Sequence, residues 1–199
     1  MRILAFSDLH LDTARAAELV EAGNSADLVI GAGDFCNMRQ GLDLAMDMLG
    51  EIRRPTVLVP GNAESADELR AAVPEGFAVL HGQGMTISGL RLFGLGYGVP
   101  ETPFGDWSCD LDEDTAADML KECEAADILI LHSPPKGVAD STSSGLSVGS
   151  VAIRDAIRRI QPRLAVCGHI HDSWGETGQI GETPVVNLGP MPNWFEIPD

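Results

Sequence analysis

Seven side chains that can bind a metal ion follow short apolar runs of this sequence. Carboxylate and amide oxygens together with imidazole nitrogens form a ligand set that suits Mn²⁺, Fe, Zn²⁺ or Ni²⁺. Because each of these side chains comes directly after an apolar run, we expect them to meet in one place. The candidate metal ligands are Asp8, His10, Asp34, Asn62, His132, His169 and His171.

The number of these residues predicts two ions rather than one. Seven candidates exceed the four ligands of a tetrahedral site. Two ions about 3.5 Å apart can share a bridging carboxylate and a bridging hydroxide, and can clamp a phosphoryl group between them. Water bound to such ions reaches a pKa of about 7, so no separate general base is required. The chemistry predicted is hydrolysis of a phosphoric ester by the bridging hydroxide.

Histidine placement supports a common site. A single His after an apolar run is usually an ordinary polar residue, but four of the five His residues of this chain are placed this way. The exception is His81, which we predict to be a surface turn residue. Cys36 comes two residues after Asp34 and could approach the ions, although a small loop residue is the simpler interpretation.

The apolar runs predict the elements that position these side chains. Short continuous runs bounded by Gly, Pro and polar residues are typical of strands buried on both faces. Ligand sites of open α/β sheets lie beyond the carboxyl ends of such strands. The predicted strands are 3–6, 28–30, 57–59, 128–131 and 164–166, and the predicted helices are 13–23, 39–52, 66–73, 112–125 and 148–160.

Other segments predict a second kind of structure. The runs 77–80, 85–87 and 90–95 are separated by short Gly turns and predict a meander. Residues 97–110 are expected to form a loop over the site. The polar segment 133–147 is either a mobile rim or lid, or a surface loop without a role. Short strands are also expected in the tail, within 174–180, 185–187 and 194–197.

Composition limits the partners and the compartment. The formal net charge is −17, with 11 Arg and 2 Lys, and such a surface repels a nucleic-acid backbone, so a long nucleic acid is a poor candidate substrate. No apolar run approaches the roughly 18 residues of a membrane-spanning helix. A strand that begins at Arg2 leaves no room for a signal peptide, and the four Cys residues form no C-x-x-C pair. We expect a single domain over 1–199 in the cytoplasm, with no membrane partner; the oligomeric state stays open.

The ordered motifs resemble those of a known family. Asp8-x-His10, Gly33-Asp34, Gly61-Asn62, His132 and Gly168-His169-x-His171 resemble, in order and spacing, the five motifs of calcineurin-like metallophosphoesterases. The resemblance extends from residue 3 to about residue 190. It implies a four-layer α/β/β/α sandwich of two mixed β-sheets flanked by helices, with a dinuclear centre.

The resemblance also implies a role for each ligand. Transferred by position, one ion takes Asp8, His10, Asp34 and His171, and the other takes Asp34, Asn62, His132 and His169. Asp34 then bridges the ions, and Asp34 and Asn62 are the residues expected to be catalytic. Manganese is the expected metal, with Fe, Zn and Ni as alternatives. Asn187-Leu188-Gly189 resembles the Asn-Pro-Gly turn that often closes the domain, with Leu in place of Pro.

One motif departs from the family. The third motif usually has His after Gly-Asn, whereas this chain has Ala63 followed by Glu64. That His stands near the leaving-group oxygen, and an acidic residue orients it. Its general-acid contribution, about 10²–10⁴-fold in rate, should be missing here, while the metal ligands remain.

The function expected is therefore hydrolysis of a small soluble phosphodiester with a good leaving group. A cyclic nucleotide is one such substrate, because 131–137 and 148–150 resemble the subgroup related to cyclic-nucleotide diesterases. Three alternatives stay open: a phosphomonoesterase or protein phosphatase, a non-catalytic metal-binding scaffold on the same fold, and a nuclease, which the charge disfavours.

Overall fold

The computed structural model describes residues 1–198 and has two β-sheets at its centre. The first sheet contains β1 (Arg2–Phe6), β2 (Leu28–Gly31), β3 (Thr56–Leu58), β4 (Phe77–Val79) and β11 (Asn193–Glu196). The second contains β5 (Gln83–Ile87), β6 (Leu90–Leu95), β7 (Ile128–Leu131), β8 (Leu164–Cys167), β9 (Thr177–Ile180) and β10 (Thr183–Asn187). The helices are α1 (Thr13–Gly23), α2 (Leu42–Leu49), α3 (Ala66–Ala72), α4 (Glu113–Lys121) and α5 (Val151–Ile160), with a 3₁₀ turn at His171–Ser173.

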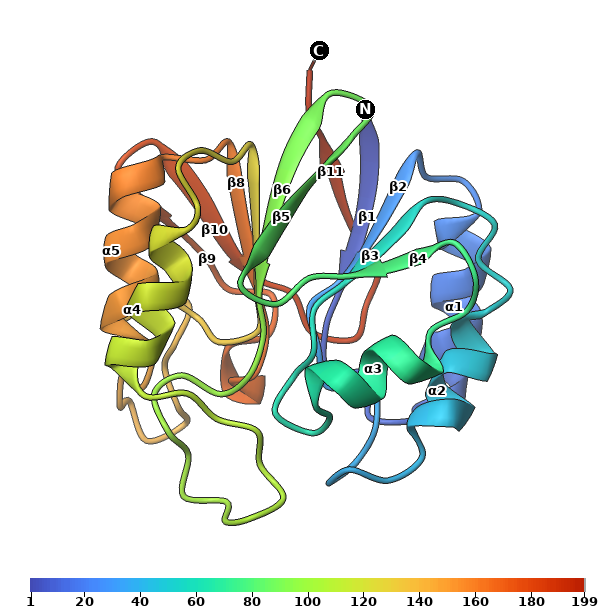
Figure 1. Ribbon diagram of the computed structural model, residues 1–199, viewed down its shortest axis with the longest axis horizontal. Coiled ribbons are helices and arrows are strands. Elements are labelled where there is room, and N and C mark those ends of the chain that lie inside the picture. Colours follow the sequence, from blue (N-terminus) through green and yellow to red (C-terminus); the bar gives the residue numbers. More distant parts are fainter. Residues whose placement is uncertain (199) are drawn as a thin grey trace.

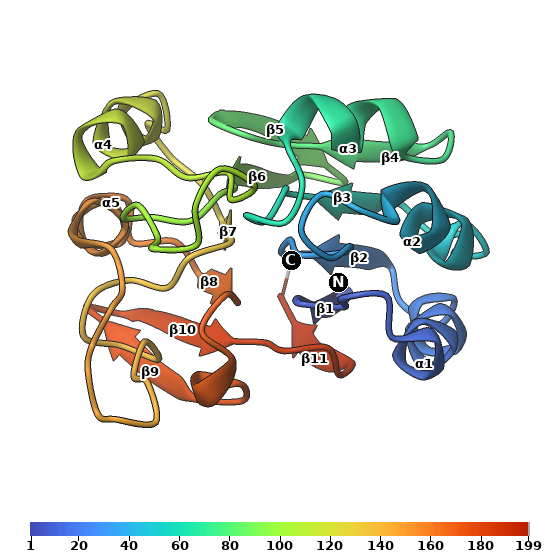
Figure 2. The same ribbon diagram turned by 90° about the horizontal axis from the view of Figure 1, so that it is seen from below.

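The two sheets pack face to face between two layers of helices. Figure 1 shows α1, α2 and α3 outside the first sheet and α4 and α5 outside the second, and Figure 2 shows the same layers from below. Strand order is β11-β1-β2-β3-β4 in the first sheet and β5-β6-β7-β8-β10-β9 in the second. The predicted four-layer α/β/β/α sandwich is therefore confirmed.

Burial on both faces explains why the central strands are apolar without alternation. In β1, Ile3 and Ala5 pack between the sheets, whereas Leu4 and Phe6 pack against the helices of the first sheet. Both sets are fully buried. At about 25 cal/mol for each Å² of apolar surface removed from water, burial on both faces of these strands contributes much of the driving force for folding.

Parallel pairing brings the chemistry to one edge. β1 pairs parallel with β2, β2 with β3, and β7 with β8. The carboxyl ends of these strands lie at the bottom of Figure 1, opposite the N-terminus, where the loop 97–110 projects. All five predicted strands that precede the candidate ligands are present.

Local sequence sets the ends of the helices. Asp12 Oδ1 accepts hydrogen bonds from the backbone N–H groups of Ala14 and Arg15, and Ser65 forms a capping box with Glu68, the arrangement that satisfies the free N–H groups of a first turn. The helix expected over 66–73 ends one residue early, at Ala72, and three others are shorter by three residues or more. The helix expected over 39–52 covers 42–49, that over 112–125 covers 113–121, and that over 148–160 begins at 151 because Ser150 caps it.

The predicted meander is wrong. β4 pairs parallel with β3 at the edge of the first sheet, whereas β5 and β6 form an antiparallel hairpin at the edge of the second. The chain therefore crosses between the sheets after β4. The predicted strand within 174–180 is also shorter, because the 3₁₀ turn and a bend precede β9. None of the helices over residues 1–198 is long and apolar enough to cross a membrane.

Candidate metal centre

The loops after β1 and β2 place the first group of candidate ligands. The Asp8 N–H donates to Gly33 O at 2.9 Å, and the His10 N–H donates to Asp34 O at 3.0 Å. These hydrogen bonds hold the two loops side by side. One donor atom each from Asp8, His10, Asp34 and His171 lies within 4.8 Å of all the others. The structure thus brings together the four residues that the resemblance assigns to one ion.

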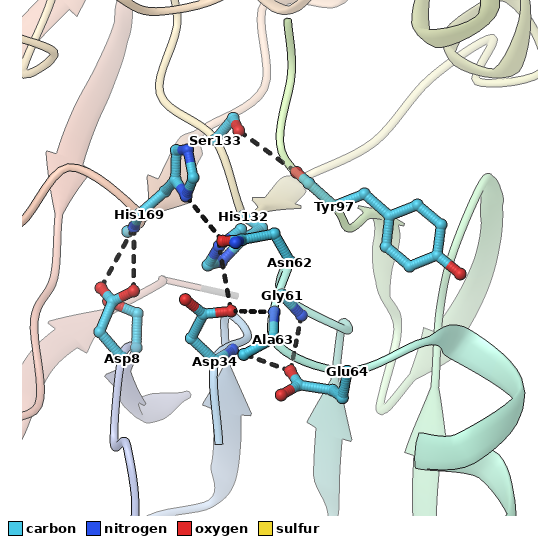
Figure 3. Close-up of polar contacts among 12 residues, drawn as sticks. Asp8, Asp34, Gly61, Asn62, Ala63, Glu64, Tyr97, His132, Ser133 and His169 are labelled. Carbon is cyan, nitrogen blue, oxygen red and sulfur yellow. Dashed lines mark hydrogen bonds and ion pairs between the residues drawn. The ribbon is translucent and has the colours of Figure 1, made fainter. Parts of the chain in front are cut away.

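A second group shares Asp34 with the first. One donor atom each from Asp34, His132 and His169 also falls within 4.8 Å of the others. Asn62 Oδ1 lies 3.1 Å from His132 Nε2 and 2.9 Å from His169 Nδ1 (Figure 3). All seven candidate ligands therefore meet in two groups joined by Asp34. Their role as metal ligands remains a prediction.

The hydrogen bonds of the His132 and His10 rings are those expected if a cation lies between each ring and Asp34. His132 Nδ1 lies 2.8 Å from Ala32 O, which places a proton on Nδ1. The other nitrogen, Nε2, then directs its lone pair toward Asp34 Oδ1 at 3.4 Å. An acceptor that faces another acceptor in a buried site is unfavourable unless a cation or proton lies between them. The donor set, oxygen and imidazole nitrogen, is that of a divalent metal site.

His10 repeats this arrangement in the first group. Its Nδ1 lies 2.9 Å from Asn37 Oδ1 and 3.1 Å from Cys36 O, so a proton on Nδ1 again satisfies the ring. Its Nε2 lies 3.4 Å from Asp34 Oδ2 and 3.2 Å from His171 Nε2. Hydrogen bonds on the outer side of a ligand ring fix its tautomer in known metal sites.

Burial and crowding decide the charge of the imidazoles. Burial lowers the pKa of His169 well below its ordinary value, and the neighbouring His132 and His171 lower it further. Burial likewise lowers the pKa of His171. Burial also acts to lower the pKa of His132, but the carboxylates of Asp34 and Asp8 outweigh it and raise the pKa. The lowered pKa values keep the His169 and His171 rings neutral, which leaves their lone pairs free for a metal ion.

Several candidate ligands have a strained backbone. Asp8, His10, Asp34 and His169 adopt positive φ angles of 54°, 46°, 58° and 69°. Non-glycine residues in this region are uncommon and cost of order 1–3 kcal/mol each. Such strain persists only where surrounding contacts impose it, and it clusters at functional sites.

Glu64 holds the strained backbone of Asp34 and joins it to a second loop. This buried carboxylate accepts hydrogen bonds from Gly61 N at 2.7 Å and Asp34 N at 2.8 Å (Figure 3). It also accepts one from Phe35 N at 3.2 Å. It therefore joins the loop after β2 to the loop after β3. Burial raises its pKa, and the nearby Asp34 carboxylate raises it further. The resemblance implied an acidic residue that orients a His, whereas here Glu64 holds the backbone.

Glycines allow these loops to approach closely. A Cβ at Gly33, whose φ is +92°, would lie 2.6 Å from the Gly61 Cα and from His132 Nδ1. A Cβ at Gly61 would overlap Asp34 Oδ1. Any side chain at either position would separate the loops that carry the candidate ligands.

The loop 97–110 sets the orientation of Asn62, a role that sequence analysis missed. Asn62 Nδ2 donates to Ser108 Oγ at 3.0 Å, and Ser108 Oγ donates to Asp110 Oδ1 at 2.9 Å. Asp110 in turn accepts two hydrogen bonds from Thr102. With its amide nitrogen held in this way, Asn62 directs its oxygen toward the His rings. The predicted position of this loop over the site is confirmed.

Trp174 has a similar effect on Asp8 and was also missed. Its Nε1–H donates to Asp8 Oδ2 at 3.0 Å, and Ser7 Oγ donates to the same oxygen at 2.6 Å. Oδ1 accepts a hydrogen bond from the His169 backbone N–H at 3.1 Å and faces His171 Nε2 at 3.8 Å. The Trp174 ring also packs on the His171 ring, with centroids 4.4 Å apart. Its position three residues after His171 was the available sequence indication.

Two other predictions have clear outcomes. Cys36 is a buried loop residue, since its Sγ donates to Ala63 O and lies beside Glu64, and burial raises the pKa of its thiol. His81 lies in a bend, as predicted, but it is half-buried and not fully at the surface. Its ring lies 4.2 Å from the ring of Tyr97, and burial lowers its pKa to about 4.

The segment 133–147 is held by its own hydrogen bonds. The buried Asp140 accepts hydrogen bonds from Gly137 N, Gly149 N and Ser147 Oγ. Asn187 Nδ2 donates to Ala139 O and also to Gly168 O, which ties this segment to the loop that carries His169. The segment lines a cavity beside His169, as a rim would.

Known proteins resemble this chain in sequence. Metallophosphoesterase domain-containing protein 1 of Homo sapiens and that of Mus musculus are each 37% identical to it over 110 residues. The match covers 52% of this chain but 32% of each relative, so the chain aligns with about a third of their length.

Solved structures share the fold at low sequence identity. TT1561 of Thermus thermophilus has a TM-score of 0.73 at 20% identity, covering 94% of this chain and 88% of that one. A dimetal phosphatase from Danio rerio has a TM-score of 0.61 at 13% identity, covering 96% and 88%. A purple acid phosphatase from yellow lupin has a TM-score of 0.58 at 11% identity, covering 100% and 46%.

A family profile covers nearly the whole chain. Residues 1–196 match the calcineurin-like phosphoesterase superfamily domain. The two groups of candidate ligands lie at the strand ends where the motifs were expected. The chain belongs to the calcineurin-like phosphoesterase superfamily.

Proposed function

We propose that this protein is a metal-dependent phosphodiesterase that hydrolyses a small phosphodiester. Membership of the family and the clustered ligands indicate a phosphoesterase that uses divalent metal ions. The preference for a diester rests on Ala63. Its backbone N–H donates to Asp34 Oδ1 at 2.8 Å, so the third motif still positions the shared carboxylate. Its side chain is a methyl group and supplies no proton to a leaving group.

The absence of a proton donor at Ala63 affects monoesters and diesters differently. An alkyl monoester such as phosphoserine must expel a poor leaving group, which a general acid helps by about 10²–10⁴-fold. A diester with a good leaving group needs that proton less. We therefore expect diester hydrolysis to exceed monoester hydrolysis.

Cavities on both sides of the cluster support a diester. One of about 560 Å³ is lined by His169 and Ile170. The other, about 600 Å³, is lined by Asp8, His10 and His171. Both fall within the range of about 300–1,000 Å³ typical of small-molecule sites. A diester places an organic group on each side of its phosphorus, whereas a monoester has only one.

The residues of this chain would hold and orient the reacting groups. In the proposed site, Asp8, His10, Asp34 and His171 hold one ion, and Asp34, Asn62, His132 and His169 hold the other. Bound ions of this kind activate water and stabilise negative charge on a phosphoryl group. Mn²⁺ is the metal we propose, with Fe, Zn and Ni as alternatives, because the donor set combines carboxylate, amide oxygen and imidazole.

The substrate we propose is small and soluble, such as a cyclic nucleotide. A net charge of −17 disfavours a long nucleic acid. All four Cys residues are free thiols, which accords with the predicted cytoplasmic location.

The test compares a chromogenic diester with its monoester. Metal-free protein is reloaded with Mn²⁺ and assayed with bis(p-nitrophenyl) phosphate and p-nitrophenyl phosphate. Turnover of the diester well above that of the monoester is expected. The reverse order would favour a monoesterase or protein phosphatase. Two bound ions without turnover of either substrate would favour a scaffold.

Two variants test the residue roles. Asp34→Asn should abolish diester turnover and reduce the bound metal, because it removes the carboxylate shared by both groups. Turnover retained in this variant would contradict the dinuclear assignment. Ala63→His should raise the ratio of monoester to diester turnover about tenfold or more, with Ala63→Asn as a control of similar polarity that cannot donate a proton as an acid.

A further inference from the structure

We propose that the cavity beside His169 binds an apolar ester substituent, alkyl or aryl, of the substrate. This inference rests on the proposed phosphodiesterase function and defines the chemistry of one side of its substrate. It follows from where the cavity lies, what lines it and how its walls are held.

The cavity borders the candidate metal centre. The candidate ligand His169 and its neighbour Ile170 are among the residues that line it. Phe104, at the tip of the loop 97–110, turns toward His169, with ring centroids 6.5 Å apart and the rings inclined at 66°. A phosphoryl group held at the metal centre would therefore extend one substituent directly into this space.

Much of its lining is apolar. Side chains of Val99, Pro100, Pro103, Phe104, Val148 and Val151 line it. Phe104 is 50% exposed and Val151 is 42% exposed, so both present apolar surface that a ligand could cover. Covering such surface is favourable by about 0.8 kcal/mol for each buried methylene.

The charged residues at the cavity are mostly committed elsewhere. Glu113 accepts hydrogen bonds from Ser150 Oγ at 2.8 Å, Val151 N at 2.9 Å and Ala152 N at 2.7 Å, so it caps α5. Lys136 Nζ donates to Ser147 O. Glu101 is the remaining charged residue, and its side chain is exposed at the rim. The polar groups therefore leave the interior to an apolar ligand.

Both walls are held in place before any ligand binds. Phe104 stacks on Trp107 with an angle of 9° between the rings. Asp110 fixes its loop through Thr102, and Asp140 fixes the opposite wall through Ser147. A preformed apolar cavity avoids the cost of ordering its walls on binding.

The cavity on the other side of the cluster has different chemistry. Asp12, Arg15 and Asn37 line it together with the candidate ligands. Its apolar lining is limited to Leu9, Trp174 and Pro190, so an apolar substituent would have fewer apolar contacts there than beside His169. The two sides of the metal centre are therefore unequal, and the apolar group belongs on the side of His169.

The test uses methyl-, propyl- and hexylphosphonate with Mn²⁺-loaded protein. We call the increase in affinity along this series the ladder. Inhibition constants are measured against bis(p-nitrophenyl) phosphate, and dissociation constants are measured by calorimetry. Each added methylene should tighten binding about two- to fourfold until the cavity is filled, since 0.8 kcal/mol corresponds to about fourfold. Aminoethylphosphonate, which carries a cation, should bind no better than methylphosphonate.

Variants of the lining residues test whether the gain in affinity arises in the cavity beside His169. Phe104→Ser and the nearly isosteric Val148→Thr should reduce the gain in affinity for each added methylene to less than about half of the wild-type gain. Methylphosphonate should bind as it does to the wild type. Leu44→Ser is the matched control, because Leu44 is equally exposed, at 53%, but lies on α2 away from the cavity. It should leave the ladder unchanged.

The outcomes separate this inference from the proposed function. Diester turnover with a flat ladder, or with a ladder that Phe104→Ser and Val148→Thr leave unchanged, would overturn the apolar site and leave the phosphodiesterase intact. Tighter binding of aminoethylphosphonate than of propylphosphonate would overturn it in favour of a cationic substituent. A steep calorimetric ladder without diester turnover would support the apolar site and reject the phosphodiesterase.

Discussion

Replacing Glu64 with Ala should destabilise the protein and weaken metal binding together. The carboxylate accepts hydrogen bonds from three backbone N–H groups within 3.2 Å, those of Gly61, Asp34 and Phe35. A buried N–H group without a partner costs about 1–3 kcal/mol, so three would cost about 3–9 kcal/mol. Water that enters the space left by the side chain would satisfy some of them. We therefore expect a loss of about 3–5 kcal/mol, a large part of the roughly 5–15 kcal/mol typical of a domain.

A graded series makes this reasoning testable. Glu64→Gln keeps one acceptor oxygen and should lose less than Glu64→Ala, about 1–3 kcal/mol. Glu68→Gln is the matched control on the neighbouring helix, where the carboxylate pairs with Arg39 near the surface, and it should cost less than about 1 kcal/mol. Free energies of unfolding come from urea titration, and Mn²⁺ content from elemental analysis after dialysis.

The Mn²⁺ content shows whether Glu64 positions the metal ligands or only contributes to stability as a buried carboxylate. Because Glu64 holds the backbone of Asp34 next to that of Gly61, the Ala variant should also retain less metal under conditions where it is folded. A Glu64→Ala protein that unfolds within about 1 kcal/mol of the wild type and retains as much Mn²⁺ would refute the reasoning.

Three further variants probe residues around the site. Trp174→Phe removes the hydrogen bond to Asp8 and should weaken Mn²⁺ binding severalfold by calorimetry; equal affinity would show that Ser7 suffices. Ser108→Ala frees the amide of Asn62 and should lower metal occupancy and turnover, which Ser108→Thr should partly restore. Burial lowers the pKa of His81 to about 4, so the unfolded chain binds a proton below about pH 6.5 that the folded protein excludes, and stability falls as the pH drops toward 4. His81→Gln should therefore reduce the loss of unfolding free energy between pH 7.5 and pH 5 by about 1–2 kcal/mol, and an identical pH dependence would contradict this.

Sequence alone identified the candidate ligands and the strands that deliver them. Residues such as Asp34 and His132 follow runs that must be buried on both faces, and parallel strands end at one edge of a sheet. The helix starts at Asp12 and Ser65 were also predictable, since capping depends on residues two or three positions away. These features are local, or follow from a general rule of sheet architecture.

Tertiary structure decided which strands pair and which side chains support the site. The runs 77–80 and 85–87 were expected in one meander, yet β4 and β5 join different sheets, because a hydrophobic pattern records burial and not pairing partners. The contacts of Glu64 with Asp34 and of Trp174 with Asp8 join residues 30 and 166 positions apart in sequence. No local pattern encodes such distances. The sequence therefore determined which residues could carry the chemistry, and only the packing of distant loops determined how they are oriented.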